Sequence, residues 1–192
     1  YLMTLNHLIG CKKDSIENYL NERLIISNNN EENRIKIVDI IPDTTIYSEY
    51  YAYSSFLMDV NQDGVNDLEF RFLFGYGHFF MNYSLYVKTM NQTKILLSVD
   101  SCALPKEQYD TILTDDFFLE GDIVIYEKGS STVPIDHLDG STSWETINSS
   151  KGLWLIGDEK FLVFKDQNNN LGWIKIELID YVSFSIKEYA YQ

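Results

Sequence analysis

The stretch LEFRFLF (residues 68–74) carries an apolar side chain at every second position. Leu68 and the three phenylalanines fall on one side of an extended chain, and they alternate with Glu69, Arg71 and Leu73. This period of two is typical of a β-strand with one buried face, whereas a helix repeats every 3.6 residues. The same alternation recurs at 34–38, 173–178 and 182–187, so the sequence predicts a chain built largely of strands.

Further runs rich in β-branched and aromatic residues lie at 45–58, 78–89, 94–99, 121–127 and 160–165. Clusters of Gly, Asn and Asp separate the runs, as expected for turns. About ten strands cannot form one open sheet without exposing an apolar face, so we expect two stacked antiparallel sheets. The prediction is an all-β sandwich over residues 34–192, with a jelly roll as one candidate arrangement. Segments 100–118 and 128–153 lack clean alternation and are expected to be long loops.

The amino-acid composition excludes several classes of protein. The 192 residues suit one domain, and 29 acidic against 15 basic residues give a formal net charge of −14. Such a surface repels phosphate, so the prediction is no nucleic-acid partner. With 15% aromatic residues there is ample side-chain surface for a core. Two cysteines exclude a disulfide scaffold and a four-thiolate zinc site.

The first residues have the features of a targeting signal rather than of a folded segment. A short apolar run ends in Leu8-Ile9-Gly10-Cys11, followed at once by Lys12 and Lys13. This pattern resembles the bacterial lipobox, in which the cysteine is acylated and becomes the mature N-terminus. Several acyl chains anchor a protein to a membrane far more firmly than one. We therefore expect residues 1–11 to be the end of a lipoprotein signal peptide; the alternative is that Cys11 is a buried structural thiol.

Residues 12–33 are expected to connect the anchor to the domain. Ile16, Leu20 and Leu24 would share one face of a short helix that begins near Asp14. The run at 28–33 is polar and has no period. A short helix packed on the domain edge and a flexible tether both fit this segment.

The stretch DVNQDGVND (residues 59–67) has the residue order of a calcium-binding loop. Oxygen-bearing side chains stand at positions 1, 3, 5 and 9, and glycine stands at position 6. Hard cations prefer such oxygen ligands, whereas zinc and copper favour His and Cys. The predicted calcium ligands are Asp59, Asn61, Asp63, Asp67 and the carbonyl oxygen of Val65. Position 12 is Phe70 and the flanks are strand-like, so the loop is not an EF-hand and resembles the strand-flanked loops of integrin-type repeats.

The alternative for this loop is a plain turn, because Asn, Asp and Gly favour tight turns without any ion. The three carboxylates argue against it, since unit charges about 4 Å apart repel by about 1 kcal/mol in water and more near a protein surface. A bound dication removes this repulsion. A second polar cluster, DQNNN (residues 166–170), has one carboxylate and is expected to be a hairpin turn.

These motifs together resemble an uncharacterised group of secreted and surface proteins of Gram-negative bacteria, many of which carry a lipobox. The likeness rests on the calcium loop and its flank (55–67) and on LGWIKI (171–176), a Gly-Trp-Ile strand that follows a turn near the C-terminus. It covers about 34–192, and it departs from the group at Leu171, where an aromatic residue is commoner. The resemblance implies a β-sandwich, a cell-envelope location (outer membrane or cell surface) and calcium, and it implies no established activity.

Catalytic signatures are sparse, so we expect a non-catalytic protein with a binding or structural role. His78, His137 and Cys102 lie outside any nucleophile motif. Acid pairs for glycoside hydrolysis could be drawn from Glu145, Asp158 and Glu159, but acidic residues are abundant throughout.

Glycan binding is the main alternative function, and glycoside hydrolysis is a more distant one. Trp144, Trp154 and Trp173 could form a platform for stacking sugars, although such residues more often anchor a core. The expected partners are a membrane, through the lipid anchor, and a glycan or protein ligand.

Overall fold

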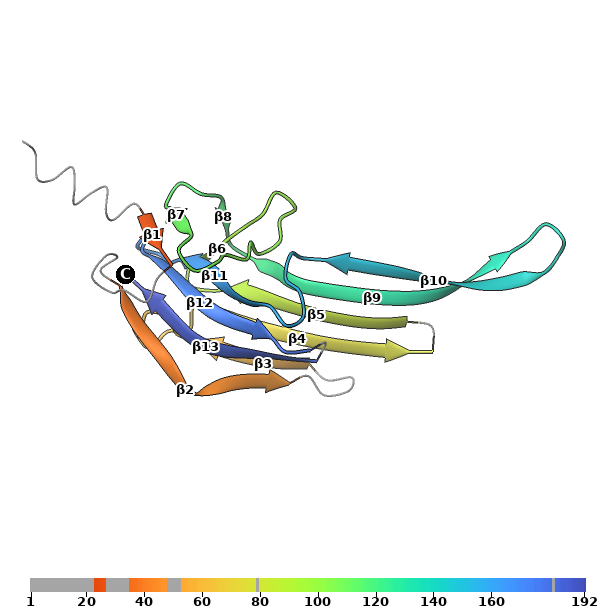
Figure 1. The fold of residues 1–192 in the computed structure, drawn as a ribbon, viewed down its shortest axis with the longest axis horizontal. Coiled ribbons are helices and arrows are strands. Elements are labelled where there is room, and N and C mark those ends of the chain that lie inside the picture. The colour runs from red at the N-terminus through yellow and green to blue at the C-terminus, as the bar shows by residue number, and fades with distance from the viewer. Residues whose placement is uncertain (1–22, 27–34, 48–52, 79, 181) are drawn as a thin grey trace, which may run out of the picture.

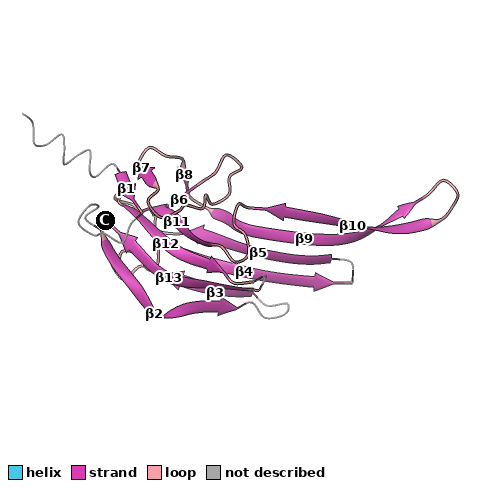
Figure 2. Ribbon diagram, viewed as in Figure 1, coloured by secondary structure: helices cyan, strands magenta, loops and turns pink. Residues whose placement is uncertain are grey.

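The computed structural model describes residues 23–26, 35–47, 53–78, 80–180 and 182–192. These residues form strands joined by turns and loops (Figures 1 and 2). Across the described ranges, no helix has the length and hydropathy needed to cross a membrane. The described residues contain strands and no helix, so the all-β prediction is confirmed.

Two antiparallel sheets stack face to face, which confirms the predicted sandwich. One sheet has the order β10-β9-β5-β4-β3, and the other has the order β2-β13-β12-β11-β6-β8. The five-stranded sheet consists of β3 (Tyr53–Met58), β4 (Leu68–Gly77), β5 (Phe80–Thr89), β9 (Asp122–Asp136) and β10 (Thr142–Lys151). The six-stranded sheet consists of β2 (Lys36–Tyr47), β6 (Lys94–Leu96), β8 (Phe118–Leu119), β11 (Glu159–Lys165), β12 (Leu171–Leu178) and β13 (Ser183–Tyr191).

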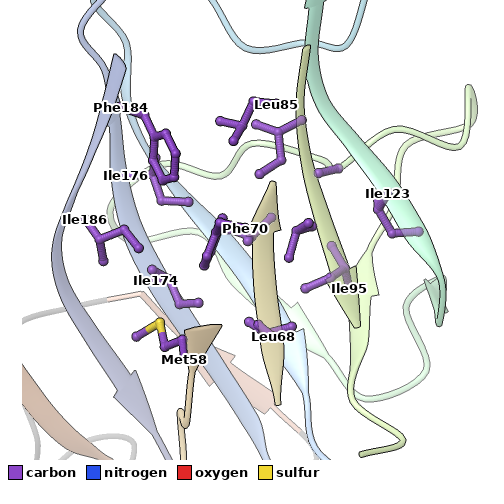
Figure 3. Packing of buried hydrophobic residues seen from close by; sticks show 14 of the residues in the cluster. Met58, Leu68, Phe70, Leu85, Ile95, Ile123, Ile174, Ile176, Phe184 and Ile186 are labelled. Atoms are coloured by element: carbon purple, nitrogen blue, oxygen red, sulfur yellow. The ribbon is translucent and has the colours of Figure 1, made fainter. Parts of the chain in front are cut away.

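The main core fills the space between the two sheets (Figure 3). Phe70 and Phe72 point from β4 toward Phe184 on β13, with ring centroids 5.7 and 6.0 Å apart. Ile174 and Ile176 complete the contact from β12, and all five side chains are buried. The alternation at 68–74, 173–178 and 182–187 thus marks the inner faces of β4, β12 and β13.

A second core covers the outer face of the six-stranded sheet. Here β1 (Arg23–Ile25) pairs with β7 (Thr111–Leu113) and buries Leu24 and Ile112. Phe161 and Trp173 meet them from the sheet, with their rings perpendicular at 5.1 Å. The six-stranded sheet is therefore buried on both faces, which explains why FLVF (161–164) and LGWI (171–174) are apolar without alternation.

Gly172 shows how tightly β12 is packed. A Cβ atom at this position would lie 2.2 Å from the Phe164 ring and 2.6 Å from the Ala190 carbonyl oxygen. The glycine of the Gly-Trp-Ile strand is thus required by close packing against both neighbouring strands.

Two expectations need correction. Residues 23–25 belong to a strand rather than to a helix or tether, because Leu24 and Ile26 are fully buried in the second core.

Residues 128–153 are largely a long hairpin of β9 and β10 rather than a loop. Alternation is weak there because all ten residues of β10 are exposed, so neither face selects apolar side chains. The prediction of a loop at 100–118 is confirmed, except that the segment contains the short strand β7 and Phe118, the first residue of β8.

The burial of Leu24 makes β1 a structural part of the domain. We predict that Leu24→Ala in the 192-residue chain lowers the free energy of unfolding by about 2–5 kcal/mol, as expected for a buried leucine. The matched control is Leu113→Ala on the partner strand, where the side chain is 41% exposed; its effect should stay within about 0.5 kcal/mol. Urea denaturation measures both, and a loss in Leu24→Ala no larger than that in the control would contradict the burial of β1 in the core.

Candidate functional site

The predicted calcium loop joins β3 to β4 at one end of the five-stranded sheet. Its ends are closed by the pairing of Met58 with Leu68 and by a hydrogen bond of 2.9 Å from the Asp67 N–H to the Met58 carbonyl oxygen. Val60 is fully buried in the main core, which fixes the start of the loop. The loop is therefore held by the sandwich at both ends.

Asp59, Asn61 and Asp63 surround one turn of this loop. The Asp63 N–H donates to Asn61 Oδ1 at 3.0 Å and to Asp59 Oδ1 at 3.2 Å. The Gly64 N–H donates to Asp59 Oδ2 at 2.7 Å, and the Val65 N–H donates to Asp63 Oδ1 at 2.8 Å. Backbone donors thus gather the side-chain oxygens of positions 1, 3 and 5 in one place.

The backbone of the turn requires glycine at position 6. Gly64 has a φ of +91°, a conformation that residues with a Cβ rarely adopt, although no atom lies within 4 Å of where that Cβ would be. Gln62 is also left-handed, with a φ of +62°. The need for Gly64 is therefore conformational and not a matter of space.

Asp67 is placed differently from the other predicted ligands. Its side chain is 1% exposed. Its carboxylate accepts hydrogen bonds from the Val60 N–H at 3.0 Å, Asn91 Nδ2 at 3.3 Å and Thr93 Oγ1 at 3.4 Å. Asp67 therefore joins the loop to the turn that follows β5, and it satisfies donors that would otherwise be buried without partners.

The aspartates of the loop influence one another electrostatically. Burial raises the pKa of Asp67, and the nearby charges of Asp63 and Asp59 raise it further, while hydrogen bonds from Asn91 and Val60 oppose the shift. No basic residue stands between positions 55 and 70, but Lys36 reaches the loop from β2 and donates to the side-chain oxygen of Gln62. The charges of Asp59 and Asp63 therefore disfavour a further negative charge on Asp67.

The donor set fits a hard cation in part. Among the described residues, no three His, Cys, Asp or Glu side chains are grouped so as to hold a metal ion, so the three aspartates do not form one such cluster. Asp59 and Asp63 each retain acceptor capacity, because a carboxylate offers about four lone-pair sites. With Asn61 and the Val65 carbonyl they could supply an oxygen set that water completes.

A second site, which the sequence analysis missed, lies on the solvent-facing side of the five-stranded sheet. Tyr53, Arg71, Leu73, Tyr86 and Asp122 line a shallow pocket of about 250 Å³. They come from β3, β4, β5 and β9, and the register places Tyr53 opposite Leu73 and Arg71 opposite Tyr86. Within single strands these residues are simply the outward positions, so the sequence alone does not bring them together.

Arg71 is the centre of a charged network in this pocket. Its guanidinium donates to Glu69 at 2.8 Å and to Asp122 at 3.0 Å, and the Tyr53 hydroxyl donates to Glu69 at 3.0 Å. The Arg71 hydrogen bond lowers the pKa of Glu69. Arg71 Nε is buried and has no hydrogen-bond partner among the described residues. The network presents fixed carboxylates beside the two tyrosines.

The three tryptophans do not form a platform. Trp154 and Trp173 are fully buried, and Trp154 Nε1 donates to the Ala103 carbonyl oxygen at 3.2 Å. Trp144 lies on the projecting hairpin and is 59% exposed. Two of the three are thus core anchors, the role that such residues more often have, and the three do not form the alternative stacking platform.

The remaining polar candidates are not gathered into a catalytic arrangement. Lys175 and Lys187 each contact the Glu159 carboxylate at 2.8 Å and lower its pKa, whereas a general acid needs a raised pKa. Asp158 accepts from the Leu155 N–H at 3.0 Å. Glu145 lies on the exposed strand β10.

The thiol and the two imidazoles lie in different parts of the fold. Cys102 is buried beside Val124, His137 contacts Ser143 in the hairpin, and His78 is exposed after β4. The polar cluster at 166–170 is the turn between β11 and β12, capped by the Asp166 carboxylate, as predicted.

Comparison with protein-family models, with curated proteins and with solved structures found no match. The resemblance to the Gram-negative surface group therefore stays a prediction. The lipobox and Cys11 lie outside the described residues, as does most of segment 12–33.

The different settings of Asp67 and Asp63 can be tested without any metal. In a chelator, Asp67→Asn should lower the free energy of unfolding by about 1–3 kcal/mol, because an amide cannot accept all the hydrogen bonds that the buried carboxylate accepts. Asp63→Asn, which changes an exposed side chain in the same way, should change it by no more than about 0.5 kcal/mol. Equal losses in urea titrations would contradict this assignment of roles.

Proposed function

We propose that the protein is a non-catalytic binding module of the cell envelope, anchored by lipid at Cys11 and stabilised by calcium in loop 59–67. The observation that carries the calcium part is the turn in which Asp59, Asn61 and Asp63 direct their oxygens around Gly64. These three side chains and the Val65 carbonyl bind the ion, and Asp67 holds the loop to the sandwich. Asp67 has one further lone pair available to the ion or to a bridging water.

In this proposal calcium stabilises the end of the β3–β4 strand pair. The loop closes the Met58–Leu68 end of this strand pair, and the buried Val60 connects it to the main core. Binding to the folded state alone stabilises that state by RT ln(1 + [L]/Kd). Sites of extracellular type bind at roughly 10⁻⁴–10⁻³ M, so calcium at a few millimolar should contribute about 1–2 kcal/mol.

The test is thermal unfolding of the 192-residue chain in 5 mM calcium and in excess chelator, concentrations set on the order of the expected affinity. Calcium should raise the Tm by about 2–4 °C for each kcal/mol of stabilisation. Asp63→Ala should remove this difference, while Asp139→Ala, in the exposed turn of the β9–β10 hairpin, should leave it unchanged. An unchanged melting curve together with no heat of binding by calorimetry would leave loop 59–67 as a plain turn.

The anchor is tested separately from the ion. When the precursor is produced in a Gram-negative bacterium, the protein should fractionate with membranes and carry acyl chains at Cys11, because several chains make the insertion stable. Cys11→Ser should move it to the soluble fraction, and mass spectrometry should show the modification only in the parent. A membrane-bound, unmodified parent protein would refute the lipoprotein assignment and leave the calcium site unaffected.

Carbohydrate binding is the second candidate, and the pocket around Arg71 favours it. Sugars are recognised by aromatic faces together with fixed hydrogen-bonding groups, and here Tyr53 and Tyr86 flank the Arg71–Asp122 pair. The sheet holds these groups rigidly, since they come from four hydrogen-bonded strands. In this hypothesis the two tyrosines, rather than the tryptophans, supply the aromatic faces on which a sugar stacks.

A glycan array probed with the 192-residue chain tests this second candidate. Binding should fall at least about tenfold in Tyr86→Ala, as expected for loss of an aromatic contact near the centre of a site. Tyr109→Ala, which removes a 72% exposed tyrosine from a loop, is the matched control. Absence of binding with and without calcium, or equal binding by both variants, would reject this pocket as a sugar site.

A further inference from the structure

Strand β10 forms an open edge of the five-stranded sheet. It pairs with β9 on one side, from Thr142 opposite Asp136 to Lys151 opposite Glu127. No other described strand pairs with its opposite side. All ten residues of β10 are exposed, and the hairpin projects from the body of the sandwich (Figure 1). Its outer backbone N–H and C=O groups are therefore available to another strand.

Apart from Lys151 at its end, this edge lacks the features that usually prevent pairing. Edge strands are commonly kept short or blocked by proline, lysine or a bulge. The pairing of β10 with β9 is continuous over ten residues, and the strand contains no proline. Its only charged residues are Glu145 and Lys151, and neither side chain forms a hydrogen bond or ion pair with the described part of the chain.

We propose that β10 pairs antiparallel with β10 of a second copy of this chain, about a two-fold axis at Asn148. In this register Glu145 of each copy lies opposite Lys151 of the other, and Ile147 lies opposite Ser149. An isologous interface repeats each contact, so the two unpaired charges of the monomer form two ion pairs. It is also the one register of β10 against itself that places opposite charges face to face.

The net charge of the molecule allows an experiment to distinguish pairing in this register from non-specific association. Each copy carries −14, so long-range repulsion opposes the dimer and should be screened by salt. We therefore expect association to strengthen from 0.05 to about 0.5 M NaCl. A partner strand from a different protein would use the same edge, but it would not require the Glu145–Lys151 symmetry.

The test is sedimentation equilibrium of the non-acylated 192-residue chain up to roughly 0.5 mM, a range that detects weak association. Glu145→Lys and Lys151→Glu should each weaken the dimer about tenfold, because each places like charges opposite one another twice. The double variant should restore the parent Kd to within about threefold. Repulsion by net charge predicts a different order, since Glu145→Lys changes −14 to −12 and should then strengthen association.

Asp139→Lys is the matched control. It makes the same charge change in the exposed turn of the hairpin, outside β10, and should not weaken the dimer. All variants lie on exposed positions, and an unchanged melting temperature confirms that they fold. A chain that stays monomeric over the whole range, or a dimer whose Kd follows net charge alone, overturns the proposal.

Discussion

Burial of both faces of the six-stranded sheet is the constraint on which the rest of the structure depends. Trp173 and Ile174 are adjacent in β12, so their side chains point to opposite faces, yet both are fully buried. One face packs on the five-stranded sheet, and the other must be covered by a further layer. The small β1–β7 pair supplies that layer, which is why residues far apart in sequence are needed to complete the domain.

The five-stranded sheet differs from the six-stranded sheet, because only one of its faces is covered by a core. Only its inner face contributes to the main core, so its outer positions are open to other uses. The Arg71 network and the flanking tyrosines lie on that outer face, and they are held in place by strands that the core fixes from behind. A rigid scaffold of this kind positions recognition groups with little loss of conformational entropy. The same sheet extends into the β9–β10 hairpin, where no core selects the side chains.

The loop at 59–67 combines buried structural residues with the exposed turn at which we propose that calcium binds. Val60 and Asp67 face the interior, and the intervening residues lie around an exposed turn. The buried carboxylate satisfies three donors, so removing it would affect folding as well as any ion. Calcium at this loop would stabilise the end of the β3–β4 pair, at a distinct location from the outer sheet face where we place the ligand.

The period-two alternation alone determined the all-β class and the inner faces of β4, β12 and β13, because burial of one sheet face leaves that pattern in the sequence. Residue type alone indicated the turn in loop 59–67, since glycine and asparagine are selected by local backbone geometry. Only the tertiary structure decided that Leu24 belongs to a strand and that 128–153 is a hairpin. It alone separated Asp67 from Asp59 and Asp63, and assembled the pocket around Arg71. These features depend on contacts between distant segments, and neither spacing nor residue type records which segments meet.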